Sequence, residues 1–112
     1  MNKLTFKLLS NNKEIINEQI NYLKQENIIK FKINDDNYEY DEKNIILVKR
    51  DSEKELTINF KEKVIIINLL SNNIKIDYPM DKSDANINNN IVILNYTLES
   101  DKTVENTIII EF

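Results

Sequence analysis

The residues of this chain that could take part in chemistry are few, and Arg50 is the most distinctive of them. It is the one arginine among 15 basic residues. Its planar guanidinium carries five N–H donors and can bind a carboxylate through two parallel hydrogen bonds. Arg50 alternates with Ile46 and Val48 on one face of the predicted strand, and if that face is buried, it points inward at a strand end, where it can close the barrel or meet a ligand carboxylate. The alternative is a surface ion pair with Asp51, Glu53 or another acid.

The tyrosines are the second group with a possible binding role. Each has an apolar ring and a polar hydroxyl, a combination that suits the wall of a ligand pocket. Packing in the core or at its rim is the alternative for all five, which are Tyr22, Tyr38, Tyr40, Tyr78 and Tyr96. The predicted ligand-binding residues are Arg50 together with Tyr38, Tyr40, Tyr78 and Tyr96.

An acidic stretch offers oxygen ligands of the kind that Ca²⁺ prefers. The spacing of an EF-hand is missing, however, and so is the glycine that its turn requires. Tyr38 and Tyr40 alternate with these acids, as in a strand that has one solvated face. We therefore predict a surface hairpin and no metal site for Asp35, Asp36, Glu39, Asp41 and Glu42.

The segment 78–86, YPMDKSDAN, contains the only proline and two carboxylates, Asp81 and Asp84. Functional residues gather on loops. The segment is interpreted as an irregular loop that serves either as a lid or binding loop, or as a plain connection.

The composition excludes several classes of chemistry. Glycine, histidine, cysteine and tryptophan are all absent. Without glycine there is no phosphate-binding loop of the P-loop or dinucleotide type. Without histidine and cysteine there are no histidine-based triads, thiol nucleophiles, disulfides or zinc-finger sites. No serine, threonine or carboxylate pair stands out in spacing, so we expect neither an enzyme nor a cofactor.

Charge and hydropathy limit the partners. The formal net charge is −4, and no stretch concentrates basic residues, which argues against duplex nucleic acid. The longest apolar runs are four residues, far short of a membrane-spanning helix. The N-terminal segment lacks the pattern of a signal peptide. We expect a cytoplasmic protein with no membrane partner.

Period-two alternation dominates the chain and is typical of strands with one buried face. The segments are short and follow one another closely, so the loops between them have no room for crossover helices. This pattern predicts an all-β, single-domain antiparallel meander with strands near residues 4–8, 29–33, 38–40, 45–48, 56–60, 74–78, 92–98 and 108–112.

Asparagine is expected to take the place of glycine in the turns, because it tolerates the left-handed backbone region better than other non-glycine residues. Turns are predicted at 11–12, 36–37, 72–73 and 88–90. Residues 13–25 remain ambiguous. Ile16, Ile20 and Leu23 have helical spacing, while a hairpin through 10–13 favours a strand, and we place the strand ahead of a short helix.

Eight to ten strands in 112 residues must form a barrel or a barrel-like sandwich. Segments such as KVIIINLL and NTIIIEF are β-prone and nearly uncharged, so an open edge would pair with other chains. Closure into a barrel removes that hazard. The apolar runs 65–67 and 108–110 suggest strands that are covered on both faces.

The order of the predicted strands resembles that of the YwiB-like family of small bacterial proteins. The resemblance is carried by NIIKFKINDDNYEYDEKNIILVKRD at 27–51, ELTINF at 55–60 and IVILNYTLESDKTVENTIIIEF at 91–112. It implies a calycin-type, lipocalin-like β-barrel with an internal cavity, and no settled activity.

Two functions follow from this interpretation. The first is a small barrel that binds a small apolar or acidic ligand inside. The second is an acidic protein–protein interaction module or inhibitor, either a homodimer or a module that docks on a basic protein partner, suggested by the net charge and the two-sided apolar runs.

Overall fold

The computed structural model describes residues 2–112, which form ten antiparallel strands and no helix. The strands are β1 (Lys3–Ser10), β2 (Lys13–Gln25), β3 (Ile28–Ile33), β4 (Asp36–Asp41), β5 (Ile46–Arg50), β6 (Lys54–Asn59), β7 (Val64–Leu69), β8 (Ile74–Ile87), β9 (Ile91–Leu98) and β10 (Asp101–Glu111). Each strand pairs with the next, and β10 pairs with β1 to close the barrel. The predicted all-β meander and its closure are confirmed.

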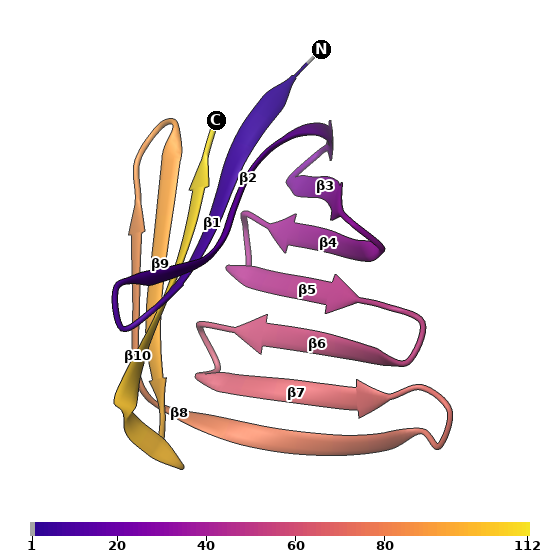
Figure 1. The fold of residues 1–112 in the computed structure, drawn as a ribbon, viewed down its shortest axis with the longest axis vertical. Coiled ribbons are helices and arrows are strands. Elements are labelled where there is room, and N and C mark those ends of the chain that lie inside the picture. The colour runs from indigo at the N-terminus through magenta and orange to yellow at the C-terminus, as the bar shows by residue number, and fades with distance from the viewer. Residues whose placement is uncertain (1) are drawn as a thin grey trace.

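The barrel is built from two sheets whose strands run in different directions (Figure 1). Strands β3 to β7 lie across the view, whereas β1, β9 and β10 stand upright beside them. Two long strands belong to both sheets. Residues 13–21 of β2 pair with β1 and its last four pair with β3, while β8 changes partner from β7 to β9 around a bulge at Met80. Such bends allow a sheet to turn a corner without a loop.

The ambiguous segment 13–25 is therefore strand β2, and the helix alternative is wrong. The helical spacing of its apolar residues has a simple explanation in the register. Ile16 and Ile20 pack against the core, but Leu23 lies beyond the corner and is exposed. The pairing with β1 shifts between Leu8 and Leu9, where Ile15 is the extra residue of β2.

The interpretation of 78–86 as an irregular loop is also wrong, since these residues belong to β8. Pro79 stands opposite Val64, and the bulge follows at Met80. Proline is tolerated there because a bulged corner needs fewer ladder hydrogen bonds than a regular strand. Asp81 forms an exposed ion pair with Lys102 at 3.7 Å.

Bulky side chains occupy the centre of the barrel. Phe6 packs against the rings of Phe31 and Tyr38, with centroids 5.3 and 5.0 Å away, and the last two rings are stacked 5.1 Å apart. These side chains come from both sheets, so the aromatic cluster joins them. The surrounding core is mainly aliphatic and includes Leu4, Ile29, Leu47, Leu94, Ile108 and Ile110.

Asparagine does serve where glycine normally would. Four of the seven positive-φ residues among 2–112 are asparagines, and the full set is Asn11, Asn12, Glu26, Asn34, Ile45, Lys63 and Asn73. The turns near 11–12, 72–73 and 88–90 are confirmed. The turn predicted at 36–37 is misplaced, since those residues begin β4 and the turn lies at Asn34 and Asp35.

Residues 2–112 contain no helix long and apolar enough to cross a lipid bilayer.

Candidate functional site

Two of the predicted site residues, Tyr38 and Tyr40, lie in the core at alternate positions of β4. Burial raises the pKa of Tyr38 to about 12, with a further contribution from the Asp36 carboxylate. Burial likewise raises the pKa of Tyr40 to about 12, helped by Glu42 and Asp41. Both phenols are therefore neutral at physiological pH and contribute ring packing to the barrel centre.

Arg50 faces outward, which corrects the expectation that it points into the barrel. In β5 the buried residue is Leu47, so Ile46, Val48 and Arg50 share the outer face. The error came from choosing the wrong parity in a run that is apolar on both sides. The guanidinium donates through Nε and Nη2 to one oxygen, Oε2, of Glu55, which stands opposite Arg50 on β6. This is the surface ion pair of the alternative interpretation, made with Glu55.

Tyr78 and Tyr96 lie on β8 and β9, away from the β5 strand that carries Arg50. Tyr78 is half-buried on β8, opposite Ile65 of β7. Tyr96 packs edge-on against Phe60 with centroids 5.9 Å apart, and burial raises the pKa of its phenol. Tyr96 also lines a small polar pocket of about 270 Å³ beside the β8 bulge, together with Ser83 and Thr97.

A larger groove of about 510 Å³ lies over strands β2 to β5. It brings Arg50 and Tyr38 together with residues that the sequence did not single out. From β2 and β3 come Asn21, Tyr22, Leu23, Lys30, Phe31 and Lys32, and from β4 and β5 come Asn37, Tyr38, Glu39, Val48 and Arg50. The groove contains two of the five predicted ligand-binding residues, Arg50 and Tyr38. We therefore regard it as the candidate site.

The groove exists because β2 leaves one sheet for the other at this corner. β2 and β3 are paired only from Tyr22 opposite Phe31 to Gln25 opposite Ile28. Beyond that point the N-terminal part of β2 pairs with β1, so Asn21 and Lys32 have no ladder partner in each other's strand. The two strands separate, and the seam between them opens above the aromatic residues Phe31 and Tyr38.

Register sets two cross-strand rows on the outer face of this groove. Leu23, Lys30, Glu39 and Val48 form one row, since each lies opposite the next. Lys32, Asn37 and Arg50 form the other. The first row has an apolar residue at each end, and the second has a cation at each end. Lysine and arginine add apolar stems to such a surface while their charges remain in water.

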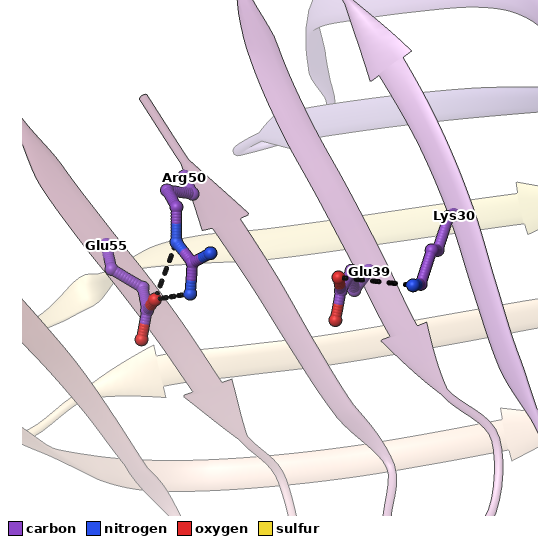
Figure 2. A network of polar contacts seen from close by, with 4 residues as sticks. All are labelled: Lys30, Glu39, Arg50 and Glu55. Carbon is purple, nitrogen blue, oxygen red and sulfur yellow. Dashed lines mark hydrogen bonds and ion pairs between the residues drawn. The ribbon is translucent and has the colours of Figure 1, made fainter. Parts of the chain in front are cut away.

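The groove is cationic although the protein is acidic. Its lining contains Lys30, Lys32 and Arg50 against the single carboxylate of Glu39. The Lys30 Nζ to Glu39 Oε1 distance is 4.0 Å between two exposed side chains, which is a weak pair. Within residues 2–112, Lys32 forms no ion pair. Figure 2 shows Arg50 turned toward Glu55, on the side away from Glu39 and Lys30.

The acidic stretch forms the predicted surface hairpin from β3 into β4, and two of its carboxylates form ion pairs at its ends. Asp36 meets Lys49 at 3.6 Å and Glu42 meets Lys24 at 2.9 Å. Asp41 accepts hydrogen bonds from Asn44 and Asn27, which lower the pKa of its carboxyl below the usual range. Over residues 2–112, no three acidic side chains come together in a group that could hold a metal ion.

Sequence reasoning missed Leu23, Lys30, Lys32 and Val48 as site residues. The alternation had correctly separated Lys30 and Lys32 from the buried Ile29, Phe31 and Ile33. What it could not supply was the seam between β2 and β3, because that depends on where β2 changes sheets. Searches with the chain against protein-family models, curated proteins and solved structures find no match. The fold and the groove together define a ten-stranded β-barrel with a cavity of ligand size on its outer surface.

Proposed function

We propose that this protein binds a small molecule with an apolar body in the groove over β2 to β5. The groove's volume of about 510 Å³ carries this proposal. Pockets that hold small ligands usually measure about 300–1,000 Å³ and have mostly apolar linings with a few polar groups. Leu23, Val48 and the lysine stems supply the apolar lining.

The exposure of Leu23 supports the same function. Its side chain is 72% exposed, the highest value among the exposed large apolar residues. A ligand that covers an exposed leucine removes apolar surface from water, and this burial favours binding by about 1.5–3 kcal/mol when it is complete. The barrel centre, by contrast, is filled by Phe6, Phe31 and Tyr38. We therefore place the ligand outside the barrel and not within it.

A neutral fluorescent probe, N-phenylnaphthylamine, tests this function. We expect its fluorescence to rise on titration with the protein, and Leu23→Asn to weaken its binding by about tenfold or more, because a buried leucine contact is lost. Backbone amide shifts in NMR spectra should change on β2 to β5. Leu70→Asn is the matched control, since Leu70 is also exposed but lies in the β7–β8 turn.

Equal loss of probe binding in the two leucine variants would contradict the groove as the site. Absence of probe binding by the wild-type protein would contradict small-molecule binding itself.

The second candidate function is self-association through an apolar patch at the β7–β8 hairpin. Leu70, Ile74 and Ile76 are all exposed there, and Ile74 and Ile76 share one face of β8. Ile74 stands opposite Leu69 and Ile76 opposite Ile67. A closed barrel offers no free strand edge, so a second copy would have to pack against this face.

Charges beside the patch favour a second copy as the occupant. The β5–β6 turn lies next to the patch, because the Leu70 amide donates to the Glu53 carbonyl at 2.9 Å. This turn carries Glu53 and ends at Lys54, which stands opposite Leu69. Two copies related by a twofold axis can exchange such opposite charges. Sedimentation velocity should show a dimer that dissociates in Ile76→Lys; a wild-type monomer at high concentration would rule out self-association.

A further inference from the structure

The cations of the groove are arranged to hold one anionic group between them. Lys32 and Arg50 lie two strands apart in the same cross-strand row, with Asn37 between them. Neighbouring strands are about 4.8 Å apart, so the two backbones are separated by about 10 Å. Extended lysine and arginine side chains can converge on a small group above Asn37, whose shorter amide leaves the space open and can donate to the same group.

The guanidinium of Arg50 retains donors for a second partner. Its Nε and Nη2 are engaged by the Oε2 atom of Glu55, with the Nε to Oε2 distance 2.8 Å. Within residues 2–112, Nη1 makes no hydrogen bond, and in Figure 2 it is turned to the side of Glu39 and Lys30. Glu55 does not line the groove. It therefore holds the guanidinium from the far side and leaves one edge exposed to the groove.

The charge balance of the groove favours an anion over a cation or a neutral group. Three cations face one carboxylate among the lining residues, and one positive charge remains in excess when Glu55, the partner of Arg50 outside the groove, is counted as well. The side chain of Arg50 is 60% exposed and keeps its charge at every physiological pH. Hydrogen bonds from charged donors to a carboxylate are shorter and stronger than those between neutral groups.

We propose that the ligand of this groove is a small amphiphilic carboxylate, whose carboxylate oxygens bind Arg50, Lys32 and Asn37 while its apolar body lies toward Leu23 and Val48. This inference rests on the proposed function and names the chemical class of its ligand. The two cross-strand rows supply the two halves of the site, since one row is cationic at its ends and the other is apolar at its ends.

Three eight-carbon ligands with different head groups test the class: octanoate, octanol and octylamine. Calorimetric or NMR titration of the wild-type protein should give an affinity for octanoate about tenfold higher than for octanol, as expected for one charge-assisted contact. Octylamine should bind more weakly than octanol. Added salt should reduce the affinity for octanoate and leave that for octanol unchanged.

Variants separate the head-group contact from general damage to the groove. Arg50→Gln should lower the affinity for octanoate to about that for octanol, and it should change octanol binding much less than octanoate binding. Lys49→Gln is the matched control, because Lys49 is a neighbouring cation in β5 that pairs with Asp36 and does not line the groove. We expect this control to bind octanoate as the wild type does.

The outcomes distinguish this inference from the proposed function. If octanol and N-phenylnaphthylamine bind but octanoate binds no tighter, the carboxylate class is overturned and the groove remains a binding site. If Arg50→Gln weakens the binding of octanoate and octanol equally, the proposed contact between Arg50 and the carboxylate is overturned. If none of these molecules binds, the proposed function fails and the inference fails with it.

Discussion

Replacing Phe6 by alanine is expected to lower the free energy of unfolding by about 3–5 kcal/mol, the usual cost of removing a buried phenylalanine. Phe6 is 1% exposed and contacts the rings of both Phe31 and Tyr38. It lies in β1 of the upright sheet, whereas Phe31 and Tyr38 belong to the other sheet. The substitution therefore leaves a cavity at the place where the two sheets are joined.

Urea denaturation followed by circular dichroism measures this effect. A domain of this size is typically stable by about 5–15 kcal/mol, so Phe6→Ala should unfold at a much lower urea concentration or be partly unfolded in water. Phe6→Leu keeps most of the volume and should cost less, which keeps the comparison measurable. Leu23→Ala, at an exposed position, should change stability by less than about 0.5 kcal/mol. A loss below 1 kcal/mol for Phe6→Ala would show that the cluster does not join the sheets.

The second large effect is a loss of stability in alkali. Burial raises the pKa values of Tyr38 and Tyr40 to about 12, whereas a tyrosine in the unfolded chain has its ordinary value of 10.0. The folded state holds these two protons more tightly than the unfolded state does. Their contribution to the free energy of unfolding is therefore fully present below pH 10 and is lost as the pH rises toward 12. A two-unit shift corresponds to about 2.7 kcal/mol, so the two phenols together account for a loss of about 5 kcal/mol.

Urea denaturation at a series of pH values, with tyrosinate absorbance as a second signal, tests this prediction. Tyr38→Phe/Tyr40→Phe removes both ionisable phenols while it keeps the rings. We expect this double variant to lose much less stability than the wild type between pH 10 and 12. The single variants Tyr38→Phe and Tyr40→Phe should each lose an amount of stability between those of the wild type and the double variant. If the double variant loses as much stability as the wild type, ionisation of other groups, such as lysines, causes the alkaline unfolding.

Most of the fold could be predicted from the sequence because one face of nearly every strand is buried. Alternation such as Ile29, Phe31 and Ile33 marks both the strand and its inner face. The same rule failed where both faces are apolar. In the apolar run 45–48, the sequence does not show which residues of β5 face the core. Arg50 was consequently assigned to the wrong side of the sheet. In β8 the proline and the charged residues suggested a loop, whereas a bulge accommodates them within the strand.

The candidate site could be predicted only in part. Arg50 was selected for its chemistry and does line the groove, and Tyr38 lines it from the core. Tyr40, Tyr78 and Tyr96 lie elsewhere, because an amphipathic side chain fits a packed core as well as a pocket wall. The assignment to a YwiB-like family stays a prediction.

The sequence by itself determined the strand order, the use of asparagine in turns and the absence of histidine, cysteine and glycine chemistry, because these depend on residue type and short-range spacing. The tertiary structure alone decided where the groove lies and which charges face it. β2 must leave β3 to pair with β1 for the barrel to turn its corner, and this exchange of partners opens the seam. The register of three further strands then brings Lys32 and Arg50, which are 18 positions apart in the chain, to the same row.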